Sequence, residues 1–294
     1  MYMKKVAYLG PAGATFSEIA YEFLASRFGA PRLSDRNTER ILTQRNEEVI
    51  PLVFKHKSYG VIAMEAKAGK RVDQSTNSFI ELLSRNGNCG GIQIIGAVRM
   101  RIHFALMARQ GVSPREIAKI AAHPEALGAC RASIEKWEVK EIIEMPSNGK
   151  AAEEVAQNDE FALAAALGPR TAAKKYGLTI LSYPFEDGKA VTTFFLLGPE
   201  DERTTVPGDE NRGLIVFQAK HQPGSLVSVL TPFAQHKINL SYVHTLYVGN
   251  GEYFFAIQTE CGRNQIFAHL QAVEKAKKFA RRCLEFGPFP IVDA

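Results

Sequence analysis

Short apolar runs stopped by glycine or proline recur along the first 200 residues of the chain. They alternate with segments in which apolar residues fall on one helical face, as after residue 15. Regular alternation of strand and helix predicts an α/β architecture with substantial parallel pairing. The predicted strands cover residues 6–9, 59–64, 92–98, 104–107, 161–167, 178–182 and 191–197, and the predicted helices include residues 147–157 and 169–176.

The apolar run between Gly188 and Gly198 carries two adjacent hydroxyls, Thr192 and Thr193, near its start. Because neighbouring strand residues point to opposite faces, only one of the two can face a given cavity. We therefore expect one threonine to be a site residue and the other to pack in the core. The simpler alternative is that both are present because β-branched residues favour strands.

The C-terminal part of the chain shows a different order of elements. Residues 200–212 are polar, contain Pro207-Gly208 and are predicted to form a linker. The predicted order beyond them is strand, helix, strand, strand, helix and strand, over residues 214–219, 224–235, 240–248, 253–259, 265–283 and 284–286. This βαββαβ order matches a ferredoxin-like sandwich. The predicted organisation is one α/β region over residues 1–199, a linker over 200–212 and a second domain over 213–294.

Composition narrows the classes of partner. The net charge of the 294 residues is +5 with acids and bases interspersed, so no basic stripe is available for a nucleic acid. The four cysteines show neither C-x-x-C spacing nor a histidine at metal-ligand intervals, and we expect reduced thiols with no metal and no cofactor. No signal peptide or apolar run of membrane length is apparent, so we expect a cytoplasmic protein without a membrane partner.

Two loops carry candidate binding residues. The loop from Gly10 leads into a predicted helix that Thr15 or Ser17 can cap, and the first free amides of that helix suit a carboxylate. The alternative is that these hydroxyls only cap. The strand over residues 59–64 ends in a basic segment over 65–72, where site residues of open α/β sheets gather, although a solvated loop would look the same. His123 precedes a proline and is more typical of a turn than of a catalytic base.

These features together resemble the prephenate dehydratase family with a C-terminal ACT regulatory domain. The resemblance rests on Gly10-Pro11-Ala12-Gly13-Ala14-Thr15-Phe16-Ser17, on His123-Pro124-Glu125-Ala126-Leu127 with Cys130, on Tyr176-Gly177-Leu178 and on Glu186-Asp187. It implies a cytoplasmic lyase with two lobes of periplasmic-binding-protein type around a cleft. The implied reaction is the decarboxylation and dehydration of prephenate, a small anionic substrate, to phenylpyruvate in phenylalanine biosynthesis. It further implies an amino-acid effector and a homodimer or homotetramer.

The resemblance assigns roles to particular residues and shows departures. Counted without gaps from Asp187, Thr193 stands opposite the threonine of the family's threonine-arginine-phenylalanine motif, and Phe194 replaces its arginine. Thr193 is thus the predicted catalytic hydroxyl. Ala66-Lys67 replaces the asparagine-serine pair that follows the family's glutamate, and we expect Lys67, Lys70 or Arg71 to supply the missing positive charge. The predicted substrate-binding residues are Thr15, Phe16, Ser17, Glu65, Lys67, Arg71, Thr192 and Phe195.

The predicted regulatory domain departs from the family as well. Gly224, Ser225 and Leu226 resemble the effector-binding glycine-alanine-leucine motif, and Asn239 and Leu240 fit the family pattern. The segment His244-Thr245-Leu246-Tyr247 replaces glutamate-serine-arginine-proline, so we expect impaired feedback by phenylalanine but retained dimerisation. Three functions remain open: a prephenate dehydratase, a non-aromatising prephenate decarboxylase or related cyclohexadienyl acid lyase, and a non-catalytic small-molecule sensor.

Overall fold

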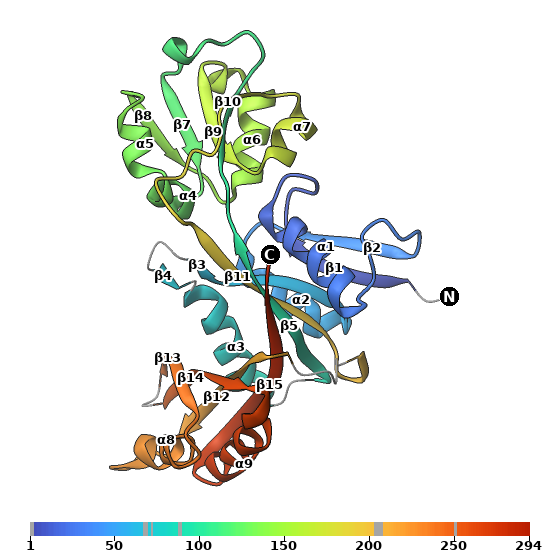
Figure 1. Ribbon diagram of the computed structural model, residues 1–294, viewed down its shortest axis with the longest axis vertical. Coiled ribbons are helices and arrows are strands. Elements are labelled where there is room, and N and C mark those ends of the chain that lie inside the picture. The colour runs from blue at the N-terminus through green and yellow to red at the C-terminus, as the bar shows by residue number, and fades with distance from the viewer. Residues whose placement is uncertain (1–2, 67–69, 72, 88–89, 203–207, 250–251) are drawn as a thin grey trace.

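The computed structural model describes residues 3–66, 70–71, 73–87, 90–202, 208–249 and 252–294. The chain is arranged in three tiers along its long axis (Figure 1). The middle tier holds the N-terminal lobe, the upper tier holds the second lobe, and the lower tier holds the C-terminal domain. In the described part of the chain, no helix is long and apolar enough to cross a membrane.

The first lobe contains the apolar strand that carries Thr192 and Thr193. Its elements are β1 (Lys4–Leu9), α1 (Phe16–Phe28), β2 (Thr38–Thr43), a 3₁₀ turn over Asn46–Glu48, α2 (Val49–His56), β3 (Tyr59–Ala66), β4 (Lys70–Arg71), α3 (Asp73–Asn86), β5 (Ile92–Arg101) and β11 (Val191–Pro199). Strand β11 lies between β3 and β5 and runs antiparallel to both, whereas β1 pairs in parallel with β2 and β3. The prediction of a buried strand at residues 191–197 is confirmed.

The second lobe is a separate sheet with the strand order β10-β6-β9-β7-β8. Its elements are β6 (Ala105–Ala108), β7 (Lys119–Ala122), α4 (Pro124–Ala129), α5 (Arg131–Glu135), β8 (Glu141–Glu144), α6 (Asn148–Gln157), β9 (Ala164–Gly168), α7 (Arg170–Tyr176) and β10 (Thr179–Ser182), with 3₁₀ turns over Pro114–Glu116 and Asp159–Phe161. Alanines of β9, α6 and α7 fill its core, so the helices pack close to the sheet.

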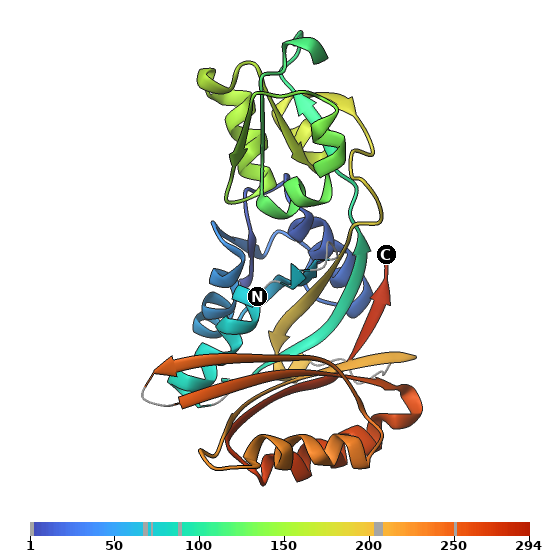
Figure 2. The ribbon, with the colours of Figure 1, turned by 90° about the vertical axis from the view of Figure 1, so that its left-hand side faces the viewer.

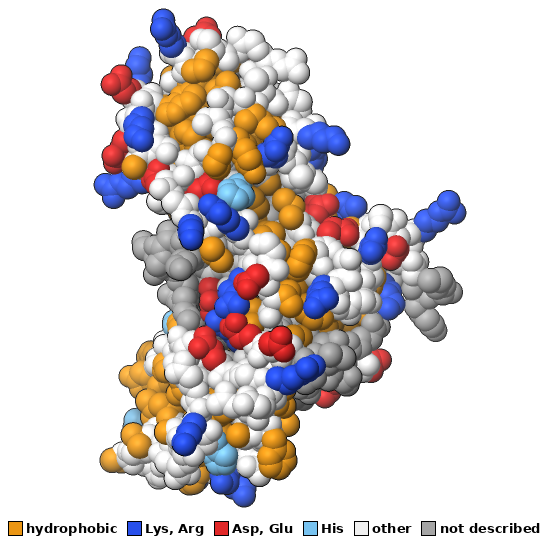
Figure 3. Space-filling model, viewed as in Figure 1, with side chains coloured by type: hydrophobic (Ala, Val, Ile, Leu, Met, Phe, Trp, Pro, Cys, Tyr) orange, Lys and Arg blue, Asp and Glu red, His pale blue; other side chains and the backbone are white. Residues whose placement is uncertain are grey.

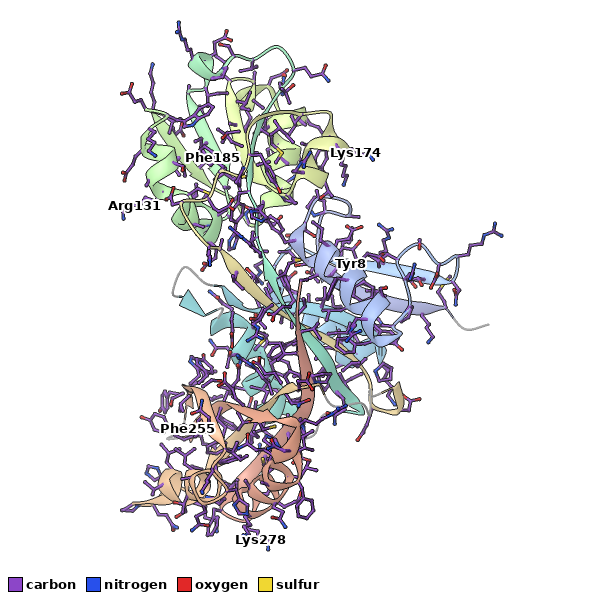
Figure 4. All side chains as sticks on the ribbon, viewed as in Figure 1. Tyr8, Arg131, Lys174, Phe185, Phe255 and Lys278 are labelled. Atoms are coloured by element: carbon purple, nitrogen blue, oxygen red, sulfur yellow. The ribbon has the colours of Figure 1, made fainter. Side chains whose placement is uncertain are left out.

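Two chain segments, residues 102–104 and 183–190, connect the lobes. They are held to each other by main-chain hydrogen bonds from Phe185 to Phe104 and from Ile102 to Ala190, both 2.9 Å long. Phe185, labelled in Figure 4, also packs edge-on against Trp137, with ring centroids 6.0 Å apart. This contact fixes the segment 183–190 to the second lobe. The two lobes are therefore joined by a short double connection, as expected for a two-lobed cleft protein.

The C-terminal domain has the predicted βαββαβ order. Its elements are β12 (Glu210–Ala219), α8 (Ser225–Gln235), β13 (Asn239–Gly249), β14 (Glu252–Gly262), α9 (Ile266–Lys277) and β15 (Ala280–Asp293), with 3₁₀ turns over Glu200–Glu202 before them and Arg263–Gln265 within them. Helices α8 and α9 cover one face of the sheet, and the other face lies toward the first lobe (Figure 2). The prediction of a helix up to residue 283 was wrong, because α9 ends at Lys277 and a long strand follows.

The C-terminal domain is fused to the first lobe by that last strand. The end of β15, Ile291 to Asp293, pairs in parallel with β5, so ten strands of the described chain form one continuous sheet. Phe289 of β15 packs against Phe195 of β11, with ring centroids 5.0 Å apart. The predicted linker is also shorter than expected, because its last three residues already belong to β12, which begins at Glu210. The two domains therefore share a core.

Candidate functional site

A cavity of about 530 Å³ lies between the two lobes. The first lobe contributes the start of α1, the 3₁₀ turn before α2, and residues of β3 and β11; the second lobe contributes the starts of α4 and α6. Polar and charged side chains and small residues make up much of the lining, and its phenylalanines come from the first lobe and from the connection between the lobes. The lining residues used below are Thr15, Phe16, Ser17, Arg45, Asn46, Glu47, Ala63, Phe104, His123, Glu125, Glu144, Ser147, Asn148, Gly149, Thr192 and Phe194.

The N-termini of helices α1 and α6 both line this cavity. Thr15 caps α1: its Oγ1 accepts a hydrogen bond from the Glu18 amide at 3.3 Å and donates one to the Leu9 carbonyl at 2.9 Å. Ser147 caps α6 in the same way, since its Oγ accepts from the Lys150 amide at 3.1 Å. The remaining free amides and the positive ends of the two macrodipoles favour anions. Thr15, Phe16 and Ser17 lie at the cavity as predicted, and the Thr15 hydroxyl acts as the cap.

The loop before α1 and the start of α6 also hold the two lobes together. Ser147 Oγ donates a 3.0 Å hydrogen bond to the Gly10 carbonyl of the first lobe. A Cβ atom at Gly149 would lie 2.6 Å from Pro11 Cδ, so glycine is needed for the loop and α6 to approach this closely. This contact closes one side of the cleft and fixes the distance between the two helix N-termini.

His123 belongs to the cavity although its sequence position indicated a turn. It caps α4, and its Nδ1 accepts a 3.3 Å hydrogen bond from the Glu125 amide, an arrangement that places the ring hydrogen on Nε2. Burial lowers the pKa of the imidazole, against the opposing effect of the Glu144 and Glu47 carboxylates. His123 is therefore neutral near pH 7 and has an N–H group available at the cavity.

The charged groups of the described cavity lining are unevenly distributed. Arg45 forms ion pairs with Glu48 at 3.0 Å and Glu47 at 3.5 Å. Glu47, Glu125 and Glu144 also line the cavity, so carboxylates outnumber guanidinium groups among the described lining residues. An anionic ligand therefore depends on the helix N-termini and Arg45 for its positive partners.

Of the two threonines on β11, the structure places Thr192 at the cavity and not Thr193, the predicted catalytic residue. Thr192 and Phe194 of β11 line the cavity, whereas Thr193 is 3% exposed and points to the other face of the sheet. Phe195 also faces away and is fully buried against Phe289. Alternation along the strand separates the two threonines as expected, but it selects Thr192 rather than Thr193 for the cavity.

Glu65 is also turned away from the cavity, for a reason that lies in the pairing of β3 with β11. Thr193 is opposite Glu65 and Phe194 is opposite Ala63, so Met64 forms a β-bulge in β3. The bulge sends Ala63 to the cavity face and Glu65 to the opposite face, where Glu65 Oε2 accepts a 3.4 Å hydrogen bond from Thr193 Oγ1. The predicted substrate-binding residue Glu65 therefore does not line the cavity in this structure.

Three predicted basic residues cannot be compared with the cavity. Lys67 lies outside the described residues. Lys70 and Arg71 form β4, with their backbones opposite Ala66 and Glu65, and the structure describes no more than their backbones. The hypothesis that one of these residues supplies the replacement charge stays a prediction.

Several cavity residues had no signal in the sequence. Asn46 holds the end of β3 by bonding the Ala63 carbonyl at 2.9 Å and the Ala63 amide at 3.1 Å. The Asn148 side chain accepts a 3.0 Å hydrogen bond from the His123 amide and thereby fixes the start of α4. Phe104, which was not among the predicted site residues, meets the ring of the predicted residue Phe16 edge to face, with centroids 5.3 Å apart. These contacts join residues that are far apart in the sequence, so local patterns do not predict them. Ser147 is different, because capping rules indicate a serine at the start of a helix such as α6.

A second cavity, of about 530 Å³, lies in the C-terminal domain at the start of α8. Ser225 and Leu226 line it together with Lys220, Glu252 and Arg281, and Gly224 immediately precedes the helix with a φ of 78°. Asn239 instead donates a 3.0 Å hydrogen bond to Glu260, and Leu240 packs in the domain core. The predicted effector residues therefore do not converge within one chain: Ser225 and Leu226 line the cavity, Gly224 precedes them in the chain, and Asn239 and Leu240 do not line it.

Comparisons with known proteins place this architecture. The model of the prephenate dehydratase family matches residues 6–202. The prephenate dehydratase of Methanocaldococcus jannaschii is 30% identical over 207 residues, which cover 69% of this chain and 72% of that protein. A bifunctional chorismate mutase/prephenate dehydratase of Stutzerimonas stutzeri is 28% identical over 289 residues, which cover 97% of this chain and 73% of that protein.

Two solved structures share the complete fold. The prephenate dehydratase of Arthrobacter aurescens in complex with L-Phe has a TM-score of 0.77 at 22% identity, covering 97% of this chain and 89% of that chain. A structure described as a novel type of quorum-quenching acylase has a TM-score of 0.74 at 20% identity, covering 97% of this chain and 98% of that chain. With the family model matching most of the two-lobed region, the chain belongs to the prephenate dehydratase family.

Proposed function

We propose that this chain is a lyase that converts prephenate to phenylpyruvate, carbon dioxide and water without a cofactor. The observation that carries the proposal is that a threonine hydroxyl on β11 and the N-termini of two capped helices line one cavity between the lobes. The family relationship supports the same reaction.

The chemistry of the reaction matches these groups. Prephenate carries two carboxylates, and each helix N-terminus offers main-chain amides and a positive dipole end to one of them. Loss of carbon dioxide leaves an electron pair that enters the ring as the ring hydroxyl departs, and one proton is taken up so that the hydroxyl leaves as water. Formation of the aromatic ring supplies the driving force.

Thr192 and His123 are the two hydrogen-bond donors of the described cavity lining that we assign to this reaction. The main chain of Thr192 is paired in the sheet, but its hydroxyl makes no hydrogen bond to another described residue and is available to a ligand. A neutral threonine is a weak acid, and its contribution is a positioned hydrogen bond to the departing oxygen rather than full proton transfer. Neutral His123 contributes a second N–H donor without adding charge. We assign Thr192 to the leaving hydroxyl and His123 to a substrate oxygen.

Incubation of the purified full-length chain with prephenate tests this function. Formation of phenylpyruvate, read by its absorbance in alkali and confirmed by proton NMR, is the expected result, and Thr192→Val should abolish most of it. A non-aromatic keto acid would identify a decarboxylase that does not aromatise the ring. Binding of prephenate without turnover would identify a sensor.

We propose an amino-acid effector for the second cavity. The free amides at the start of α8 and Lys220 suit a carboxylate, and Glu252 suits an ammonium group, although Glu252 also pairs with Arg281 at 3.2 Å. The L-Phe complex of the structural neighbour supports an amino acid in a protein of this fold. Calorimetric titration with amino acids tests the site, and we expect L-Phe to bind weakly because His244 to Tyr247 replace the family's charged motif.

We further propose that the chain works in the cytoplasm as a homodimer or homotetramer joined through its C-terminal domain. Exposed apolar side chains on this domain, including Val227, Tyr247 and Phe267, support the assembly. Light scattering coupled to size-exclusion chromatography measures the assembly directly. A monomer at micromolar concentration would contradict it.

A further inference from the structure

Arg212 of β12 lies at the junction between the C-terminal domain and the first lobe, with 9% of its side chain exposed. Its Nη1 is 3.2 Å from Glu65 Oε1 on β3, and its Nη2 is 2.9 Å from Glu260 Oε1 on β14. Figure 3 shows the mixed acidic and basic side chains that gather between the middle and lower tiers. Arg99 lies in the same cluster, bound to Glu210 at 2.6 Å and Asp293 at 2.8 Å.

The Glu65 carboxylate joins Arg212 to β11. Its Oε1 binds Arg212, and its Oε2 accepts the hydrogen bond from Thr193. Thr193 is next to Thr192, which lines the substrate cavity, and Glu65 is two residues from Ala63, which also lines it. The Arg212–Glu65–Thr193 contacts therefore lie directly behind the strand ends that form the cavity wall.

The position of Thr193 relates these contacts to the family's threonine-arginine-phenylalanine motif. With Thr192 facing the cavity, the family's threonine-arginine-phenylalanine motif corresponds to Thr192-Thr193-Phe194, and Thr193 stands in place of the arginine. An arginine at residue 193 would leave the strand on the same face as Glu65. In this chain a guanidinium group meets Glu65 from a different domain.

We propose that Arg212 replaces the missing motif arginine from the C-terminal domain and acts as a positioning residue for the substrate cavity. It neutralises Glu65, so that the end of β3 stays paired through its main chain with β11 and Thr192 keeps its place in the cavity wall. The positioning role rests on the proposed lyase function. Removing Arg212 leaves Glu65 and Glu260 without this partner in a partly buried place, and the strand ends shift to let water reach the carboxylates.

A rescue experiment in the full-length chain separates this role from a general loss of stability. Arg212→Ala should lower kcat about 10- to 100-fold with a smaller change in KM, because small displacements of a reacting group are costly. Thr193→Arg alone should also impair the enzyme, since two guanidinium groups would then compete for one carboxylate. The double variant Thr193→Arg/Arg212→Ala should recover most of the activity, because it moves the guanidinium group to the motif position.

Arg282→Ala is the matched control. Arg282 also links the C-terminal domain to the first lobe, through a 3.2 Å hydrogen bond to the Ser84 carbonyl, but in the described part of the chain it makes no hydrogen bond or ion pair with Glu65, so kcat should stay within about twofold of wild type. Arg212→Lys, which keeps a charge at the junction, serves as a folded variant if the alanine change prevents folding. Partial activity of Arg212→Lys that exceeds Arg212→Ala is expected.

Hydrogen exchange of the amides of residues 60–65 and 191–195 provides a readout that does not need turnover. Exchange should rise in Arg212→Ala and return toward wild type in the double variant. Unchanged exchange and unchanged kcat in folded Arg212→Ala would overturn the proposal, as would a folded double variant no better than either single variant. If wild-type protein does not turn over prephenate, the lyase function fails while the exchange experiment still decides the positioning of the strands.

Discussion

The two adjacent threonines of β11 provide a direct test of the cavity assignment, because each can be changed to valine with almost no change in shape. Thr192→Val removes a hydroxyl that lines the cavity, and Thr193→Val removes one that contacts Glu65 on the opposite face. The two variants carry the same chemical change one residue apart. They therefore act as controls for each other.

The expected magnitudes differ because the two hydroxyls have different partners. If Thr192 donates to the oxygen that departs in the transition state, its loss should lower kcat by about 10²- to 10³-fold, the range seen for single preorganised donors. Thr193 makes a hydrogen bond of 3.4 Å, which is long, to a carboxylate that Arg212 also binds. Its loss should cost about 1 kcal/mol of folding stability at most and less than about threefold in kcat.

Initial rates of phenylpyruvate formation over a range of prephenate concentrations give kcat and KM separately. Thermal unfolding followed by circular dichroism shows whether both variants are folded. The expected pattern is a large loss of kcat in Thr192→Val and near wild-type kcat in Thr193→Val. The opposite pattern, with Thr193→Val inactive and Thr192→Val active, would refute the assignment and restore the order counted from Asp187.

Three further predictions follow from the same structure. Glu125→Gln should lower KM for prephenate about fivefold in saturation kinetics, because the Glu125 carboxylate lines the cavity and its repulsion of a bound anion costs on the order of 1 kcal/mol; an unchanged KM would place the anion elsewhere. Burial lowers the pKa of His269 to about 4, so as the pH falls the unfolded chain binds a proton at this residue before the folded chain does. The free energy of unfolding should therefore fall by about 3 kcal/mol between pH 6.5 and pH 4. Urea unfolding should show this loss, and His269→Gln should reduce it. Asp187→Ala removes hydrogen bonds of 2.6 and 2.7 Å to the first amides of α5 and should cost about 1 kcal/mol in the same assay, while a neutral result would show that the cap contributes nothing.

The sequence predicted those parts of the fold that depend on local pattern. The buried strand around Thr192 and Thr193, the opposite directions of the two hydroxyls and the βαββαβ order of the C-terminal domain are all present in the structure. Each follows from residue periodicity or turn chemistry over a few positions. The direction in which a strand face points depends instead on its neighbours, and periodicity alone does not determine it.

The errors at Thr193 and Glu65 have the same kind of cause, a shift of one residue that turns a side chain to the other face of the sheet. Counting from Asp187 treated the chain between Asp187 and the strand as having the family's length, and a shift of one residue exchanges the two faces of a strand. The bulge at Met64 had the same effect on β3, because it placed Glu65 on the face opposite to Ala63. Neither a one-residue difference in a loop nor a bulge leaves a hydrophobic pattern that could reveal it.

The membership of His123 in the cavity could not be read from its neighbours in the sequence either. A histidine before proline at a helix start satisfies a capping role, and the structure confirms that role. What gives it access to a ligand is the packing of α6 and the first lobe around it, through Asn148 and the contact between Ser147 and Gly10. Capping and ligand binding are compatible because they use different ring nitrogens.

The loss of the motif arginine has a different consequence once Thr192 is placed in the cavity. Counted with Thr193 as the catalytic residue, the arginine would have been lost beside the substrate, and another cation would be needed to hold the anion there. Counted with Thr192, the changed position is Thr193, which is buried and faces Glu65 rather than the ligand. The substrate cavity then keeps both the hydroxyl and the phenylalanine of the motif, Thr192 and Phe194. The departure therefore bears on how the cavity wall is held and gives no reason to expect that dehydration is lost.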